Sequence, residues 1–300
     1  MIKSVTVTNH LGDSLTIKLG DSAETGFLIK NIDGLGPVKA SINTTDIVTG
    51  DGSYFNSARV DERNIVFTFI LTDVSTIEEA RLLAYKMFPV KRNVNLLFET
   101  DTRNVKIEGY VESNSPDIFS KQETVQVSII CPDPFFRSTE DSLVTFDGIE
   151  SLFEFPFSNE GGEDEIVLGE IEQTKLRSIL YKGDEDTGIV FSLHALGEVS
   201  QIAIYNVETR QSIKIDTDLL MRLTGQKISA GDDIIINTNK GNKSVTLIRA
   251  GESYNIFNCI NRDADWLTLS QGVNTFAYTA KSGTENLLME MDYYLRYGGI

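Results

Sequence analysis

Histidine and cysteine, which most often carry catalysis or bind transition metals, are scarce in this sequence. The 300 residues include two histidines, His10 and His194, and two cysteines, Cys131 and Cys259. A zinc site needs several such ligands at short spacing, and a Ser-His or Cys-His nucleophile needs a histidine beside it. The sequence also has no phosphate-binding glycine loop, dinucleotide fingerprint or Gly-x-Ser-x-Gly elbow. We therefore predict no catalytic residues, no metal site and no cofactor, so the chain is not expected to be an enzyme.

Both cysteines end apolar, strand-like runs, "VQVSIIC" at Cys131 and "SYNIFNC" at Cys259. This placement predicts buried free thiols, because a disulfide framework would need more cysteines at closer spacing. The N-terminal "MIKSVTVTNH" has no apolar signal core. No later run approaches the roughly 18 apolar residues that a membrane span requires. We expect a chain made in a reducing cytoplasm, with no membrane insertion.

Two other kinds of side chain leave binding or catalytic alternatives open. The 44 aspartates and glutamates could hide a glycosidase acid pair, since two acids placed across a cleft leave no signal in one sequence. The acidic "SNEGGEDE" at residues 158–165 could be a loop or a calcium site, although the regular ligand alternation of a calcium loop is missing. Trp266, the one tryptophan, could stack on a sugar ring or pack into a core from an alternating strand.

The charge of the chain excludes one class of partner. The formal net charge is -17, and such a field repels phosphate backbones, so we expect no nucleic-acid binding. The charge is also uneven, with a net of -4 over residues 1–137 and -13 over residues 138–300. This asymmetry predicts two units with different neighbours.

Strands and a single good helix are predicted in the first half of the chain. The stretches "IKSVTVTN" and "DSLTIKLG" alternate apolar and polar residues, which predicts two half-buried strands joined by a hairpin turn. "NIVFTFIL" at residues 64–71 is a further strong strand. "DVSTIEEARLLAYKMF" has Ser75 or Thr76 as its cap, acids in its first turn, one apolar face and Pro89 after it. These features predict a helix packed on a sheet.

The second half shows short strands and turns, and "LLMRLTG" could form a short helical turn. The "CPDPFFRS" stretch ends the first predicted domain, because two prolines in three residues cannot continue a central strand. We place an N-terminal domain at residues 1–137, a transition at 138–175 and a C-terminal domain at 176–300. Runs such as "GDDIIINT" and "KSVTLI", separated by turn residues, are typical of a β-sandwich or jelly roll.

The order of these motifs resembles the distal tail proteins (Dit) of long-tailed bacteriophages that infect Gram-positive hosts. "IDGLGPVKASINTTDIVTGDGSYFNSARVDERNIVFTFIL", the helix before Pro89 and the closing "GYVESNSPDIFSKQETVQVSIICPDPFF" are similar to the N-terminal domain of that family. "GDDIIINTNKGNKSVTLIRAG", "WLTLSQGVNTFAYTA" and the terminal "YYLRYGGI" are similar to its C-terminal domain. The resemblance implies a mainly β fold. It consists of an N-terminal β-sandwich-like domain with one helix and a C-terminal galectin-like β-sandwich.

The resemblance also implies a structural function at the tail tip, or baseplate, of the virion. Six copies would form a ring through their N-terminal domains. That ring would join the major tail tube protein to the tail-associated hub or lysin protein. It would also scaffold host-attachment proteins, including receptor-binding proteins. The stretch that matches the N-terminal domain contains Gly34, Gly36, Pro37 and Arg59, which we name as candidate residues of the ring interface.

Two alternatives from other functional classes stay open at the level of sequence. The first is a carbohydrate-binding adhesin module, which rests on the C-terminal sandwich, on Trp266 and on ten tyrosines. The second is a glycoside hydrolase with an acid pair. Neither the host nor the type of tail follows from the sequence.

Overall fold

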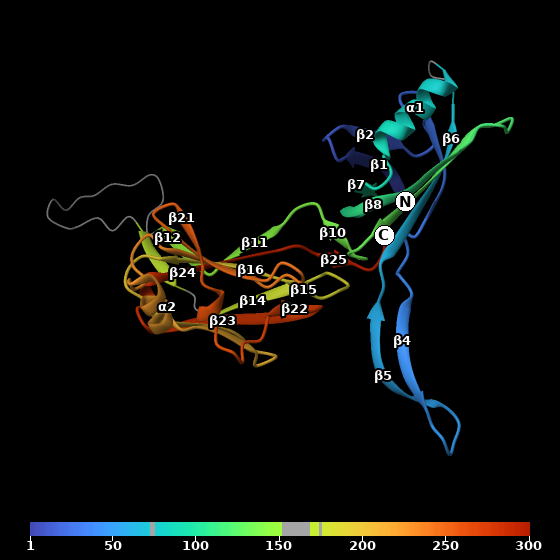
Figure 1. Cartoon of the computed structure of the whole chain (residues 1–300). Helices are drawn as coiled ribbons and strands as arrows, with labels where there is room; N and C mark the ends of the chain where they lie inside the picture. Colours follow the sequence, from blue (N-terminus) through green and yellow to red (C-terminus); the bar gives the residue numbers. More distant parts are fainter. Residues whose placement is uncertain (73–75, 152–168, 174–175) are drawn as a thin grey trace, which may run out of the picture. The chain divides into compact units, whose positions relative to one another are not determined.

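The computed structural model describes residues 1–72, 76–151, 169–173 and 176–300 (Figure 1). The chain folds as two compact units. Unit 1 comprises Met1–Glu140 and Arg296–Ile300, and unit 2 comprises Asp141–Leu295. Each unit has a separate hydrophobic core.

This division differs in two respects from the one expected from the sequence. The segment expected as a transition contains β11 (Ser142–Thr145), which belongs to a sheet of unit 2. Residues 296–300, expected in the C-terminal domain, belong to unit 1. The acidic stretch at residues 158–165, which left a calcium site open, lies outside the described residues.

Unit 1 is built on one large antiparallel sheet with the order β2-β1-β7-β8-β9-β6-β3, to which β10 and β25 add. Its two end strands, β2 and β3, approach one another, so the sheet curls around its core. Among the described residues, two further strands, β4 and β5, pair only with each other. The strands of unit 1 are β1 (Ile2–Asn9), β2 (Ser14–Lys18), β3 (Phe27–Asp33), β4 (Ala40–Asp46), β5 (Ser53–Val60), β6 (Arg63–Leu71), β7 (Asn93–Thr100), β8 (Asn104–Asp117), β9 (Thr124–Cys131), β10 (Phe136–Ser138) and β25 (Arg296–Tyr297).

Alternation along the strands of unit 1 builds its core, as the sequence predicts. In β6 every second residue from Ile65 to Leu71 is buried. Two of these residues, Phe67 and Phe69, stack with ring centroids 5.4 Å apart, and Phe67 also stacks on Phe98 of β7. Successive side chains of a strand point to opposite faces, so this period of two buries one face of the sheet.

The predicted helix is α1 (Ile77–Met87), and its ends match the sequence signals. The Thr76 hydroxyl accepts a hydrogen bond from the backbone N–H of Glu79, which satisfies one of the free donors of the first turn. The helix packs Ala80, Ala84 and Met87 into the core of unit 1 and ends two residues before Pro89. Thr76 is therefore the N-cap, and Ser75 lies outside the described residues.

Unit 2 is a β-sandwich of two antiparallel sheets with the orders β11-β24-β16-β19-β20-β21 and β14-β23-β17-β18. The pairs β12–β13 and β15–β22 lie outside these sheets. Its other elements are β12 (Asp147–Ser151), β13 (Gly169–Gln173), β14 (Leu176–Tyr181), β15 (Thr187–Gly188), β16 (Val190–Ala195), β17 (Ser200–Asn206), β18 (Ser212–Ile215), α2 (Thr217–Thr224), β19 (Asp233–Asn237), β20 (Ser244–Arg249), β21 (Glu252–Asn255), η1 (Phe257–Cys259), β22 (Thr268–Leu269), β23 (Gly272–Ser282), η2 (Thr284–Asn286) and β24 (Leu287–Tyr293).

The two sheets of unit 2 share one core. Phe191 of β16 and Phe276 of β23 belong to different sheets, and their rings meet edge to face with centroids 5.9 Å apart. The "GDDIIINTNKGNKSVTL" stretch forms the β19–β20 hairpin, in which Ile234 pairs with Leu247 and Ile236 with Val245. All four of these side chains are buried, as the alternation predicts.

Residues 296–300 are fixed to unit 1 by pairing and by charge. Arg296 and Tyr297 form β25, which pairs with β10. The Arg296 guanidinium donates to the Asp133 carboxylate at 2.5 Å, and Arg137 donates to the same carboxylate at 2.8 Å. Burial opposes ionisation of Asp133, but the two arginines outweigh it and hold the pKa of this carboxyl below its ordinary value.

We expect Asp133→Asn to lower the free energy of unfolding of unit 1 by about 1–2 kcal/mol near neutral pH, because two charge-assisted hydrogen bonds are weakened. A carboxyl whose pKa is lowered by folding stabilises the protein above its ordinary pKa of about 3.9. That contribution is lost as the pH falls through the lower folded value. The difference between wild type and variant should therefore shrink at about pH 3, as measured by urea unfolding followed by circular dichroism. A difference that does not change with pH would contradict this role of Asp133.

Candidate assembly interface

Strands β4 and β5 form a hairpin, here called the arm, that stands clear of the large sheet of unit 1 (Figure 1). They pair antiparallel from Ala40 opposite Val60 to Asp46 opposite Ser53. Every residue of both strands is exposed to solvent. The arm therefore has no hydrophobic core of its own within the described part of the chain.

The arm nevertheless has one apolar face. Residues that pair directly across two strands lie on the same face of the ribbon. Ile42 pairs with Ala58 and Ala40 with Val60, and the register after the bulge at Asn43 and Thr44 places Phe55 on this face too. Ile42 is 63% exposed and Phe55 is 68% exposed, which is unusual for side chains of this size.

The opposite face of the arm is polar. It presents Ser41 opposite Arg59, Asn43 opposite Ser57 and Thr45 opposite Tyr54. Asn56, the extra residue at the bulge, donates a hydrogen bond to the Thr45 hydroxyl at 2.7 Å. The arm is thus an amphipathic two-stranded ribbon with unpaired edges. Such a hairpin is marginally stable in water by itself, and its edges are suited to pairing with another chain.

The end of the arm next to the large sheet, here called its root, is held by a buried arginine, Arg63, which is 1% exposed. Its Nε donates to the carbonyl of Pro134 at 2.6 Å, and one terminal nitrogen donates to the carbonyl of Gly298 at 2.6 Å. The other terminal nitrogen donates to the carbonyls of Gly36, at 2.7 Å, and Gly34. These four carbonyls come from the segment before the arm, from the loop after β9 and from residues 296–300.

Arg63 is bound by carbonyl oxygens and an aromatic ring. Its guanidinium carbon lies 4.5 Å from the ring centroid of Phe136. Burial lowers the pKa of Arg63, but the ordinary pKa of arginine is so high that the side chain stays charged near neutrality. The planar guanidinium offers five N–H donors, so one side chain can satisfy several buried carbonyls at once.

The four interface residues predicted from the sequence all lie at the root of the arm. The carbonyls of Gly34 and Gly36 accept from Arg63, as described, and Pro37 lies against Gly299. Arg59 is on the polar face, where its Nε lies 3.2 Å from an Asp61 carboxylate oxygen. Their role in a ring interface remains a prediction. Sequence reasoning missed Arg63, because nothing in its local sequence distinguishes it from Arg59.

Gly34 has a conformation and a surrounding that fit only glycine. Its φ is 86°, in the left-handed region that side chains disfavour. A Cβ atom at Gly34 would overlap with the carbonyl oxygen of Asn64. Gly12, in the β1–β2 turn, has a similar φ of 88° but open space around it. A comparison of substitutions at the two glycines therefore separates the cost of backbone strain from the cost of steric overlap.

Trp266 lies in unit 2, outside its strands. Its ring stacks on Phe257 with centroids 5.5 Å apart and an angle of 26° between the planes. The ammonium of Lys243 lies 4.8 Å from the centroid of the Trp266 ring. Trp266 packs against the edge of the core of unit 2 and stays partly exposed. Whether a sugar stacks there remains a prediction.

The cysteines are structural, as their sequence positions predict. Cys131 and Cys259 are buried free thiols. Burial raises the pKa of the Cys131 thiol to about 12 and also raises that of Cys259, so neither is poised to be a nucleophile. His194 Nδ1 lies 2.6 Å from the carboxylate of Asp233 on the surface of unit 2. Among the described residues, no three His, Cys, Asp or Glu side chains are grouped to hold a metal ion. No helix in the same residues is long and apolar enough to span a membrane.

Comparison with known proteins finds a family similar to most of unit 2. Residues 182–297 match the family model of the siphovirus-type tail component, C-terminal domain. This part of the chain is similar to that domain, and the resemblance to distal tail proteins is confirmed. No curated protein matches the chain.

A solved structure shares the fold over nearly the whole chain. The crystal structure of Dit (gp 19.1) of phage SPP1 aligns over 98% of this chain and 100% of that one, with a TM-score of 0.66 and 12% identity. At this identity the likeness establishes the fold, so the predicted mainly β fold class is confirmed. Two structures of the phage p2 baseplate in its activated conformation, with calcium and with strontium, align over 97% of this chain. They cover 98% and 97% of their own chains, with TM-scores of 0.46 and 0.47 and 11% identity.

The first test of the arm's root compares two glycine substitutions. Gly12→Ala should lower the free energy of unfolding by about 1 kcal/mol, because the alanine must adopt a positive φ. Gly34→Ala should cost at least about 1 kcal/mol more, because the backbone of Asn64 must also move. Urea unfolding followed by circular dichroism measures both values. Equal losses would show that the close approach at Gly34 is unimportant.

The second test replaces the buried arginine. Arg63→Met keeps an unbranched apolar stem but removes the guanidinium and leaves four carbonyls without their donor, so we expect a loss of at least about 3 kcal/mol from unit 1. Arg59→Met is the matched control, because Arg59 is 80% exposed and should change the stability by less than about 0.5 kcal/mol. Trp266, the one tryptophan, lies in unit 2, so its fluorescence shows whether that unit stays folded. If Arg63→Met unfolds no more easily than Arg59→Met, Arg63 does not hold the root.

Proposed function

We propose that this chain is a structural protein of a bacteriophage tail tip that forms a hexameric ring. In this proposal the ring joins the tail tube protein to the tail-associated hub protein and scaffolds host-attachment proteins. A role as a phage tail or baseplate component rests on the family match of residues 182–297 and on the fold. The similar SPP1 Dit is described as a paradigm of the hub adsorption apparatus in phages that infect Gram-positive bacteria.

The main observation that supports a ring is the exposed apolar face of the arm. A ribbon with an apolar face, exposed on both sides and anchored only at its root, gains stability when another chain covers it. A head-to-tail contact between copies that closes on itself uses such edges without growing into a fibre. The number six comes from the resemblance to distal tail proteins and is tested by mass. The function is assembly, with no catalytic step.

The test measures mass by light scattering after size-exclusion chromatography, with negative-stain images of the same peak. We expect the wild type to form ring-shaped particles of six times 33.3 kDa, alone or with a tail tube or hub protein. The double variant Ile42→Asp, Phe55→Asp should remain monomeric, because it places charge on the apolar face of the arm. Its unfolding should match that of the wild-type monomer, since both side chains are exposed.

Leu11→Asp is the matched control. Leu11 is 72% exposed in the β1–β2 turn of the same unit, away from the arm, so this variant should form rings like the wild type. A wild type that stays monomeric at all concentrations, both alone and with tail partners, would refute the ring. A double variant that still forms rings would move the interface away from the arm.

A further inference from the structure

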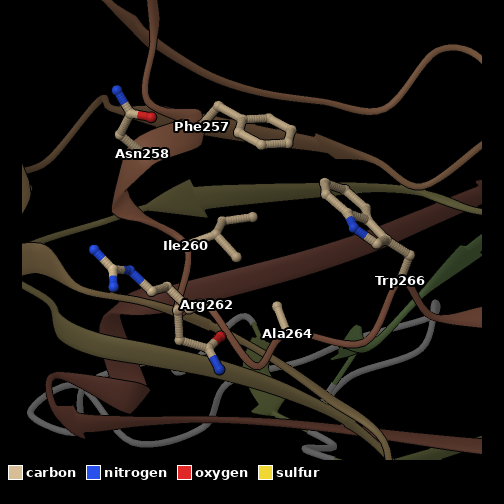
Figure 2. A pocket seen from close by; sticks show the side chains of 7 residues that line it. Phe257, Asn258, Ile260, Arg262, Ala264 and Trp266 are labelled. Carbon is tan, nitrogen blue, oxygen red and sulfur yellow. The ribbon is translucent and has the colours of Figure 1, made fainter.

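A hollow of about 440 Å³ opens on the surface of unit 2 (Figure 2). It is built from one continuous segment that begins at η1 and ends just before β22. Two aromatic rings, two small or branched apolar side chains, two amides and a guanidinium line it: Phe257, Trp266, Ile260, Ala264, Asn258, Asn261 and Arg262. In Figure 2 Phe257 and Trp266 border one side, Arg262 lies across from Trp266, and Ile260 lies between them.

Backbone bonds hold this segment against the edge of the sandwich. Ile260 bridges Ile215 of β18, and the N–H of Asn261 donates to the Lys214 carbonyl at 3.0 Å. The N–H of Lys214 donates in return to the Asn261 side-chain oxygen, also at 3.0 Å. Cys259 and Leu267 anchor the segment in the core. The side chains that line the hollow therefore project from a fixed backbone, which lowers the entropic cost of binding a ligand.

The aromatic part of the hollow offers a flat apolar surface. Phe257 is 43% exposed, although its ring is supported by Trp266. Trp266 already has Phe257 and Lys243 as neighbours, so Phe257 offers the more open ring face. The sequence names Trp266 as a candidate stacking ring, and that role stays a prediction. Trp266 orients the stacking ring, and Phe257 provides it.

The polar part of the hollow offers unused hydrogen-bond donors. Within the described part of the chain, the Arg262 guanidinium and the Asn258 amide make no hydrogen bond or ion pair. The Asn261 side-chain oxygen is occupied by Lys214, which leaves its NH₂ group. An aromatic platform flanked by a few fixed polar groups suits a ligand that has both an apolar face and many hydroxyl groups. A pyranose ring has both.

The charge around the hollow selects among ligands that stack on aromatic rings. A nucleotide base could also stack on Phe257, with its phosphate at Arg262. However, residues 138–300 carry a net charge of -13, and Asp263 and Asp265 follow Arg262 closely in the sequence. That field disfavours phosphate and does not affect an uncharged sugar.

We propose that the hollow of residues 257–266 binds a neutral hexopyranose unit of a glycan, stacked on Phe257 and hydrogen-bonded by Arg262 and Asn258. Unit 2 alone forms the site, so the proposal does not depend on the ring and holds for monomer and assembly alike.

The experiment uses Trp266, whose fluorescence reports on the hollow alone because the chain has one tryptophan. The full chain is titrated with methyl glucoside, methyl galactoside, N-acetylglucosamine, lactose and maltose. We expect a saturable change with at least one of these sugars, in the millimolar range. Saturation-transfer NMR, which observes the sugar, should give the same affinity. No saturable response to any of the five by either method would overturn the proposal.

Two substitutions and two controls locate the site. Phe257→Ala and Arg262→Ala should each weaken binding at least tenfold in the NMR measurement. Arg262 is exposed, so its removal does not threaten folding. The controls Phe119→Ala, 95% exposed in unit 1, and Arg177→Ala, exposed on β14, should bind like the wild type. Equal binding by Arg262→Ala and Arg177→Ala would refute the site. A response to oligothymidylate with none to the sugars would replace the proposal with nucleic-acid binding.

Discussion

The guanidinium of Arg63 joins three parts of the chain that are far apart in sequence. Its partners are the carbonyls of Gly34 and Gly36, of Pro134 and of Gly298. Buried carbonyls need a donor, and here one side chain supplies it to four of them. The chain leaves the large sheet to form the arm just after Gly34 and Gly36, and it returns to the sheet just before Arg63. One buried cation therefore holds the start of β4 and the end of β5 at the root of the arm and fixes residues 296–300 beside them.

This anchor explains how an unsupported hairpin can still be positioned. The tip of the arm gains nothing from the core of unit 1, since its side chains are exposed and its edges are unpaired. The root is closely packed, because a Cβ atom at Gly34 would overlap with Asn64 and the buried Arg63 donates to four carbonyls. A fixed root with a free apolar face loses little entropy when a second chain covers it. The local structure and the proposed assembly thus rest on the same interaction.

Sequence reasoning succeeded where a local pattern decides the structure and failed where distant backbone groups decide it. The period of two in β6, the Thr76 cap and the β19–β20 hairpin follow from neighbouring residues. The partners of Arg63 are backbone carbonyls, which every residue has, so no residue type in the sequence identifies them. The strands of the arm were expected, but their departure from the sheet was not, because the alternation of a strand does not reveal what covers its faces. The pairing of β25 with β10 was missed because it joins residues about 160 apart.

The arm and the hollow make opposite demands on their surroundings. The arm is apolar on one face and would be stabilised by a second chain, whereas the hollow has free donors beside an exposed ring and would bind the proposed sugar only if it stays open. They belong to units with separate cores, so each can change without unfolding the other. The uneven charge fits this separation. In the proposed assembly, the unit with the arm carries little net charge, so copies of it would meet with little repulsion. The strongly acidic unit would repel phosphate but not the uncharged sugar proposed for the hollow.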